Sequence, residues 1–266
     1  MLNKSKFFTL IKVAFIYILP RPNLGYRYKM FRIYKHIKLG INKLLFGSRY
    51  YLSTKEIVDR NRGDWHIELN DSRVKDQFII LDKYFDFIVN HISKGNKNFS
   101  ILDVGCREGY LLEKLKKYGV ENVKGFEIVP GWVEYCHTKG RHYVEKKNLL
   151  EINPNNCEKY DIVLSRHALE HVDRTNKFFY NLTKLTKNGG YLIVVFPLNK
   201  IPKFKHPSYL PSVEYVINNF NFNDLDVLYI GRLDNFVYKG AHINLLDDRE
   251  NDEVIIFCKR REMQYE

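Results

Sequence analysis

A short apolar run that ends at two closely spaced glycines is the segment that most constrains the fold of this chain. Residues 99–104 are typical of a strand that is buried on both faces. Gly105 and Gly109 follow, and glycine lets a backbone turn sharply and approach a ligand because it has no Cβ. Residues 111–118 predict a helix whose first N–H groups point back at the turn. The segment suits a nucleotide-like or carboxylate-bearing ligand, and Asp103 is placed to fix the turn or to bind a ligand ammonium.

A second acidic residue follows at the end of the next predicted strand. Residues 123–128 form an apolar run that includes Glu127, 24 residues after Asp103. A carboxylate in this position can accept hydrogen bonds from both hydroxyls of a ribose. The alternative is that Glu127 is a solvated strand end.

These segments, with three that follow, resemble the class I S-adenosylmethionine-dependent methyltransferases from about residue 99 to 196, and more loosely to Arg260. Arg107 stands where that family commonly has glycine, so we expect the loop to sit differently against the methionine end of the cofactor. Asn188 replaces a common proline in the glycine-glycine turn of residues 185–194. Besides this turn, four motifs carry the resemblance. They are Asp-Val-Gly-Cys-x-x-Gly at 103–109, Glu127, Lys-Asn-Leu at 147–149, and residues 160–172, which end in Leu-Glu-His-Val.

The chain is long enough, at 266 residues, for one α/β domain and an extension. Strands and helices are expected to alternate, the pattern of a doubly wound, mostly parallel sheet. The resemblance implies seven strands in a Rossmann-like methyltransferase fold, with the last strand antiparallel beside the fifth. We predict a basic helical extension and linker or lid over residues 1–75 and the methyltransferase domain over 76–266. The expected strands are near 99–104, 122–128, 142–146, 160–165, 191–196, 226–230 and 253–258, and the expected helices near 74–92, 109–118, 131–139, 174–187 and 212–220.

The candidate binding residues lie at the ends of these strands, where open α/β sheets bind ligands. The resemblance implies S-adenosyl-L-methionine as cofactor. Asn148 is placed to hydrogen-bond an adenine edge, and Ile128 and Leu149 to sandwich the ring. The full predicted cofactor-binding set is Asp103, Gly105, Cys106, Arg107, Gly109, Glu127, Ile128, Asn148, Leu149 and Arg166.

Two histidines just after the fourth strand, His167 and His171, are the predicted catalytic residues. A histidine of near-neutral pKa that accepts the proton of an acceptor hydroxyl contributes roughly 10²–10⁴-fold to the rate. The alternative is that either ring caps the following helix or lines the pocket. His206, in the loop after the fifth strand, is a weaker third candidate.

Other chemistries lack their motifs. The sequence has no metal-ligand spacing, no Gly-x-x-x-x-Gly-Lys phosphate loop, no Asn/Asp-Pro-Pro-Tyr stretch and no Pro-Cys nucleophile. Its four cysteines form no Cys-x-x-Cys pair, which fits a reducing compartment, so we expect a cytoplasmic protein. No specific nucleic-acid signal appears.

The positive charge is concentrated at the start of the chain. Of a net +12, residues 1–60 hold 13 Lys and Arg but only two acidic residues. Residues 25–46 alternate apolar and basic side chains at helical spacing, which predicts a basic amphipathic helix. It could make a peripheral contact with anionic lipid on the inner face of the membrane, or with a polyanionic partner. A cap on the domain or on a second subunit, and a basic presequence, are the alternatives, and the oligomeric state stays open.

We therefore expect methylation of a small molecule, at the oxygen of a sugar or a lipid-linked acceptor. One alternative is a catalytically weak binding module for RNA or a protein, which the arginine at position 107 favours. A nicotinamide-dependent oxidoreductase is a further alternative, but residues 104–109 do not supply the Gly-x-Gly-x-x-Gly that it needs.

Overall fold

The computed structural model describes residues 72–199, 207–245 and 252–262. The predicted extension before residue 72 lies outside these residues, as does His206. Helix α4 begins at Ser72, a few residues before the predicted start of the domain. No helix among the described residues has the length and apolar character needed to cross a membrane.

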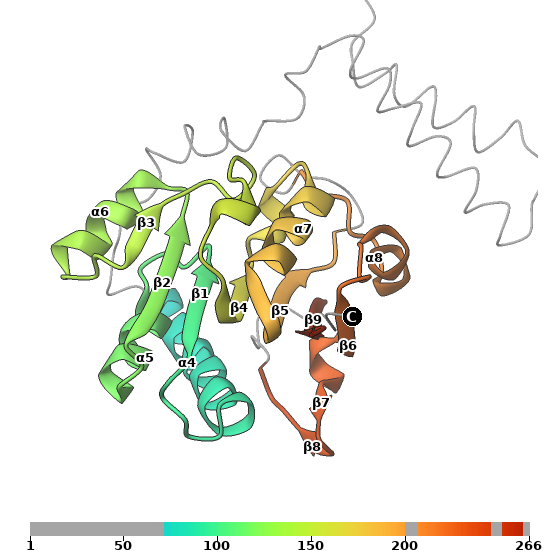
Figure 1. Ribbon diagram of the computed structural model, residues 1–266, viewed down its shortest axis with the longest axis horizontal. Helices are drawn as coiled ribbons and strands as arrows, with labels where there is room; N and C mark the ends of the chain where they lie inside the picture. Colours follow the sequence, from blue (N-terminus) through green and yellow to red (C-terminus); the bar gives the residue numbers. More distant parts are fainter. Residues whose placement is uncertain (1–71, 200–206, 246–251, 263–266) are drawn as a thin grey trace, which may run out of the picture. The chain divides into compact units, whose positions relative to one another are not determined.

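A seven-stranded sheet forms the centre of the domain, in the order β3-β2-β1-β4-β5-β9-β6 (Figure 1). The first five strands are parallel, and β9 lies antiparallel between β5 and β6. This confirms the predicted fold class and the predicted place of the last strand. The strand bounds are Ser100–Val104 (β1), Asn122–Glu127 (β2), Val144–Lys146 (β3), Tyr160–Arg166 (β4), Thr186–Pro197 (β5), Leu225–Arg232 (β6) and Glu253–Arg260 (β9).

Apolar residues on both faces of the sheet hold the layers together. Along β1, Ile101 packs into one core cluster and Leu102 into the other, because successive side chains of a strand point to opposite faces. Helices α4, α5 and α6 contribute to the first cluster, and α7 and α8 to the second. The helices are Ser72–Asp86 (α4), continued by a π-helical turn at Phe87–Ile92, Tyr110–Tyr118 (α5), Pro130–Thr138 (α6), Thr175–Leu185 (α7) and Val213–Asn219 (α8).

Two parts of the fold differ from the expected elements. The helix predicted over 174–187 ends at Leu185, because Thr186 is already extended and begins β5. A hairpin of β7 (Val237–Tyr238) and β8 (Ala241–His242) was not expected. Its two turn residues, Lys239 and Gly240, both have positive φ, as tight hairpin turns require.

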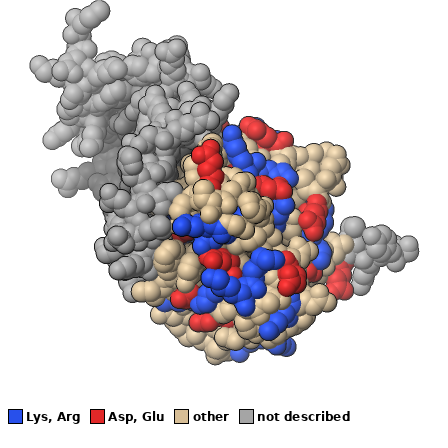
Figure 2. All heavy atoms as spheres, turned by 90° about the vertical axis from the view of Figure 1, so that its left-hand side faces the viewer, with Lys and Arg blue, Asp and Glu red and all other residues tan. Residues whose placement is uncertain are grey.

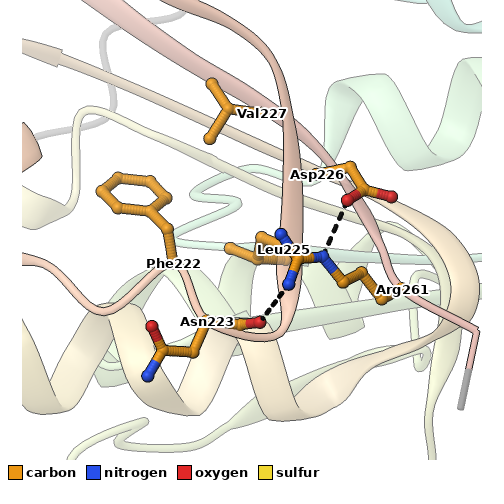
Figure 3. A pocket seen from close by; sticks show the side chains of 6 residues that line it. All are labelled: Phe222, Asn223, Leu225, Asp226, Val227 and Arg261. Carbon is orange, nitrogen blue, oxygen red and sulfur yellow. Dashed lines mark hydrogen bonds and ion pairs between the residues drawn. The ribbon is translucent and has the colours of Figure 1, made fainter.

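Charged side chains of both signs are interspersed over the face of the domain in Figure 2. A cavity of about 610 Å³ opens at the start of β6 and the end of β9, where Arg261 Nε donates to Asp226 at 2.7 Å (Figure 3). Because β9 pairs antiparallel with β5, the end of β9 and this cavity lie at the N-terminal ends of the parallel strands, opposite to their C-terminal ends. It therefore does not include the predicted site. The remaining lining residues are Phe222, Asn223, Leu225 and Val227.

Candidate functional site

The glycine turn after β1 packs against two other strand ends. The N–H of Gly105 donates to the carbonyl of Phe126 in β2 at 2.8 Å. A Cβ added to Gly105 would lie 2.9 Å from the Cβ of Ala168, which follows β4. Gly105 and Gly109 have φ values of +81° and +68°, which side chains disfavour. Both glycines are therefore needed for the turn that the sequence predicts.

Glu127 joins this turn to the end of β2. One carboxylate oxygen accepts from the backbone N–H of Arg107 at 2.9 Å, and the other from those of Ile128 and Val129 at 2.7 and 2.8 Å. Burial raises the pKa of Glu127, and these three hydrogen bonds only partly offset the rise. Since a carboxylate can accept about four hydrogen bonds, roughly one remains for a ribose hydroxyl instead of the two expected.

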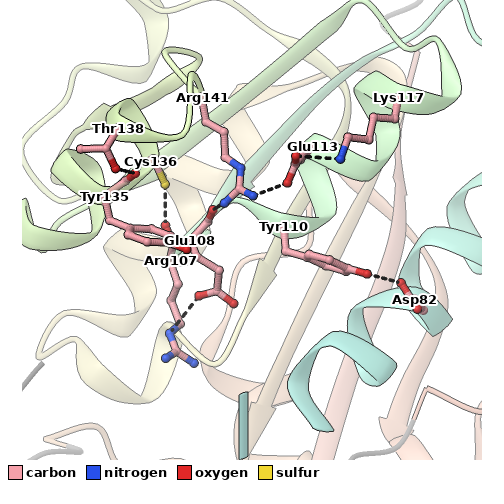
Figure 4. Close-up of polar contacts among 10 residues, drawn as sticks. All are labelled: Asp82, Arg107, Glu108, Tyr110, Glu113, Lys117, Tyr135, Cys136, Thr138 and Arg141. Atoms are coloured by element: carbon pink, nitrogen blue, oxygen red, sulfur yellow. Dashed lines mark hydrogen bonds and ion pairs between the residues drawn. The ribbon is translucent and has the colours of Figure 1, made fainter. Parts of the chain in front are cut away.

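Polar contacts brace the turn from the side of α5 and α6 (Figure 4). Arg141 donates to the carbonyl of Glu108 and forms an ion pair with Glu113. The thiol of Cys136 donates to the carbonyl of Arg107 at 3.3 Å. Arg141 lies in the loop between α6 and β3, where no sequence motif marks it. These contacts hold the carbonyls of Arg107 and Glu108 on the side of the turn that faces α5 and α6.

Asp103, the acid before the turn, is buried with 7% of its surface exposed. Burial raises the pKa of its carboxyl to about 7. The charge of Arg166 lowers this pKa, and the nearby Glu127 and Glu108 raise it. Arg166, at the end of β4, also lies over the ring of Tyr84, 5.9 Å from its centroid. A carboxyl with this pKa gains from a cationic ligand, since a positive charge favours its ionised form.

The loop after β3 holds the next predicted residues. The side-chain oxygen of Asn148 accepts from the N–H of Leu150 at 3.1 Å, which leaves its amide group as donor. Leu149 is buried, and its carbonyl accepts from the amide of Asn181 in α7 at 2.6 Å. The thiol of Cys106 is buried in the core against Gly125, so a cofactor contact of this residue would use its backbone, and its place in the cofactor-binding set stays a prediction.

Arg107 adopts the left-handed backbone that glycine would adopt more easily, with φ +48°. Its guanidinium lies over the ring of Trp132 in α6, 4.9 Å from the centroid. Its Nε atom is 3.6 Å from Oε2 of Glu108, whose side chain is 7% exposed. The departure from the family pattern thus places a fixed cation beside the glycine turn.

His167, just after β4, lies between two buried glutamates. Its Nε2 contacts Oε1 of Glu253 at the start of β9, and its Nδ1 is 3.3 Å from Oε1 of Glu170. Burial alone would lower the pKa of His167, but the hydrogen bonds with Glu170 and Glu253 outweigh it and raise the pKa to about 9. Its backbone is also left-handed, with φ +52°, and its N–H donates to Val195 at 2.9 Å.

This geometry differs from the near-neutral, accessible base that the sequence predicts. Both ring nitrogens of His167 face carboxylates, and the ring is cationic at pH 7, so it holds a proton instead of accepting one. Glu253 was not predicted, because β9 carries no motif. Only its antiparallel pairing with β5 brings the first residue of β9 to the C-terminal ends of the parallel strands. His171 is half-exposed, with Nε2 3.9 Å from Oε1 of Glu170. A catalytic role for either histidine stays a prediction.

The residues present fit an S-adenosylmethionine-type ligand. The glycine turn allows close approach, the buried carboxyl of Asp103 suits a positive charge, and Glu127 keeps an acceptor position for a hydroxyl. Among the described residues, no group of three His, Cys, Asp or Glu side chains is arranged to hold a metal ion. The C-terminal ends of the parallel strands therefore bring together the glycine turn and the carboxyls of Asp103 and Glu127, with His167 after the neighbouring strand β4.

Comparison with known proteins agrees with this geometry. Residues 102–194 match the family model described as a methyltransferase domain. A ubiquinone biosynthesis O-methyltransferase of Dictyostelium discoideum is 27% identical over 112 residues, which cover 37% of this chain and 35% of that protein. One of Rickettsia akari is 29% identical over 119 residues, covering 44% of this chain and 47% of that protein.

The fold also matches solved structures. Magnesium protoporphyrin IX methyltransferase of Synechocystis PCC 6803, with bound S-adenosylmethionine, superposes with a TM-score of 0.52 and 18% identity over 79% of this chain and 98% of that one. This likeness shows the fold. The matched segment spans less than half the length of the two O-methyltransferases, so their whole activity does not transfer by similarity alone.

Proposed function

We propose that this chain is a class I S-adenosylmethionine-dependent methyltransferase that transfers the cofactor's methyl group to an oxygen atom of a small molecule. The match of residues 102–194 to the methyltransferase-domain model and the seven-stranded fold support this proposal. The observation that carries the proposal is the glycine turn that Glu127 ties to β2, next to the buried carboxyl of Asp103. The O-methyltransferase names of the two relatives support oxygen as the methylated atom.

The reaction needs little from the protein beyond placement. When bound, the cofactor supplies a methyl group that its sulfonium already activates. The acceptor oxygen forms a bond to the methyl carbon as the carbon–sulfur bond breaks, and the hydroxyl proton leaves to a base or to solvent. Holding the reacting atoms in line supplies roughly 7–11 kcal/mol of the barrier reduction. The braced glycine turn and the buried strand ends fit this task.

The half-exposed His171 is the better candidate for the base, because the two glutamates hold the proton on His167. His167 then acts as a fixed cation at the wall of the acceptor site. For the acceptor we propose a sugar or a lipid-linked molecule, since a basic N-terminal extension would bring the domain to an anionic membrane.

Calorimetry with S-adenosylmethionine and its demethylated product, S-adenosylhomocysteine, tests the cofactor. Both should bind, and Glu127→Ala should weaken both by about tenfold or more, because the variant frees the turn and removes a hydroxyl acceptor. A thermal melt of the variant shows whether the fold survives. Absence of binding by the wild-type chain contradicts the proposal, and NADH binding in its place indicates the oxidoreductase.

Transfer is tested with methyl-labelled S-adenosylmethionine and a panel of phenols, sugars and polyprenyl-linked sugars. Label in a hydroxyl-bearing product supports the proposal, and the class of that product identifies the acceptor. Cofactor binding with no transfer to any member of the panel favours the binding-module alternative. Label found only on nitrogen contradicts the oxygen assignment.

A further inference from the structure

Arg141, in the loop between α6 and β3, joins the glycine turn to α5. Its Nη1 atom donates to the carbonyl of Glu108 in the turn, and its Nη2 atom forms an ion pair with Glu113 in α5 (Figure 4). Only 13% of the arginine side chain is exposed. A guanidinium that is covered to this extent needs such partners, because an unpaired buried charge is costly. The contacts of Arg141 therefore differ from an exposed surface salt bridge, which contributes little.

The carboxylate of Glu113 gives this guanidinium a fixed anchor. Glu113 also pairs with Nζ of Lys117, one helical turn further along α5, at 2.9 Å. Burial raises the pKa of Glu113, but the hydrogen bond with Lys117 and the charge of Arg141 outweigh this effect and lower the pKa, so the carboxylate stays ionised. The guanidinium is a rigid planar fork. Because one of its nitrogens is held on α5, the place where the other meets the carbonyl of Glu108 is fixed as well.

The carbonyl that Arg141 holds belongs to the peptide between Glu108 and Gly109. Gly109 has a φ of +68°, and a glycine reaches many other backbone conformations at little cost. On the other side of Glu108, Arg107 also has a positive φ, of +48°, which an ordinary residue disfavours. A Cβ added to Gly109 would lie 3.6 Å from Cδ of Arg141, so the stem of this arginine covers the glycine. A turn of such residues needs an outside contact to keep one conformation, and Arg141 supplies it.

We propose that Arg141 is a positioning residue for the cofactor, which locks the peptide between Glu108 and Gly109 in the conformation that binds. The inference rests on the proposed function, because the locked turn is part of the proposed cofactor site. Arg141 acts through the turn, from the side that faces α5 and α6, and not through a contact with the ligand. Without the lock, the apparent affinity falls in proportion to the fraction of molecules whose turn has the binding conformation.

Calorimetry of the full chain with S-adenosylhomocysteine tests the lock. Arg141→Met keeps an apolar stem over Gly109 but removes the fork. It should weaken binding by about 10–100-fold, the range for a lost hydrogen bond to a charged group. Arg141→Lys should weaken binding less, because lysine keeps the charge without the fork. The titrations are made well below the melting temperature of each variant, where loss of a merely stabilising contact leaves the affinity of the folded protein unchanged.

Lys117→Met is the matched control, since Lys117 contacts the same carboxylate of Glu113 but not the turn. The Lys117 side chain is 74% exposed, so its loss should change the affinity by less than about threefold. Glu113→Gln removes the charge of the anchor instead, and should weaken binding in the same direction as Arg141→Lys. The effects of these two variants should not add when they are combined, because both act on one lock.

Amide hydrogen exchange of the ligand-free protein gives a second readout, which does not depend on the cofactor. The N–H of Gly109 donates to the carbonyl of Cys106 at 2.9 Å, so its exchange reports opening of the turn. Arg141→Met should accelerate exchange at Gly109 by about tenfold or more relative to Leu102 in β1, which reports the stability of the sheet. If Arg141→Met does not fold, Arg141→Lys and Glu113→Gln carry both measurements.

Two results would overturn the inference while leaving the proposed function intact. The first is wild-type affinity for S-adenosylhomocysteine in the folded Arg141 variants. The second is an equal loss in Lys117→Met, which would assign the effect to α5 instead of the turn. If the wild-type chain bound neither S-adenosylmethionine nor S-adenosylhomocysteine, the proposed function itself would fail, and unchanged exchange at Gly109 would show separately that Arg141 does not hold the turn.

Discussion

His167 lies between two buried carboxylates, so its charge makes the free energy of unfolding of the domain depend on pH. The pKa of this histidine is raised from 6.5 to about 9 in the folded protein. Its ion pairs therefore contribute fully below about pH 6.5, and this contribution is lost as the pH rises through 9. The difference in pKa corresponds to about 3 kcal/mol at most.

Glu253→Gln should reveal this dependence. We expect the variant to be less stable than the wild type by about 1–3 kcal/mol at pH 6, because it removes one of the two carboxylates that hold the imidazolium. The deficit should shrink as the pH passes 9, where the wild-type ring is neutral. Urea unfolding at pH 6, 7.5 and 9.5 measures the difference.

Asp252→Asn is the matched control for this series. Asp252 is the adjacent residue, but its side chain is 58% exposed and pairs with Arg232 at the surface. An exposed pair contributes about 0–1 kcal/mol, so this variant should change stability little at any of the three pH values. An equal effect of both variants, or a deficit of Glu253→Gln that grows above pH 9, would contradict the assignment of charge to His167.

The glycine turn, at the scale of a single element, depends on both backbone conformation and space. Gly95 and Gly105 have nearly the same φ, +79° and +81°, but an added Cβ meets nothing within 4 Å at Gly95. Gly95→Ala should therefore cost about 1–2 kcal/mol for the backbone alone. Gly105→Ala adds the contact with Ala168, and should cost about 1–3 kcal/mol more.

Urea unfolding measures the two costs, and S-adenosylhomocysteine binding separates their effect on the site. Only Gly105→Ala should weaken binding, since it pushes the turn away from the segment after β4. Adding Ala168→Gly to Gly105→Ala removes the opposing methyl group and should recover the larger part of the extra cost. Equal costs for the two alanine variants would mean that the close approach of the turn to Ala168 has no energetic weight.

The elements that local sequence could predict are those with a local physical cause. Apolar runs predicted β1, β2 and β4 almost to the residue, and the resemblance supplied the antiparallel place of β9. The start of β5 at Thr186 was missed, because pairing with Tyr160 of β4 extends a segment that looks helical in isolation. Glu253 and Arg141 were missed because tertiary contacts alone bring them to the site.

The whole molecule carries its charge unevenly. The charged side chains on the visible face of the domain are of both signs (Figure 2), whereas residues 1–60 hold 13 of the 43 Lys and Arg and only two of the 31 acidic residues. That first segment lies outside the described residues, so its role remains a proposal from the sequence. We propose that it holds the protein at the inner, anionic face of a membrane.

Vesicle binding tests this proposal. Each Lys or Arg near an anionic leaflet contributes about 1 kcal/mol, and salt screens the attraction. Apolar side chains such as Phe7, Phe8, Ile11 and Phe15 would add burial in the interface. The full chain should therefore cosediment with phosphatidylserine-containing vesicles, less so at high salt, and hardly at all with neutral lipid.

Deletion of residues 1–45 should abolish this vesicle binding while S-adenosylhomocysteine still binds, because the glycine turn and strand ends lie beyond residue 98. A truncated protein that unfolds, or that loses a dimer seen with the full chain, would instead identify the segment as a packing element.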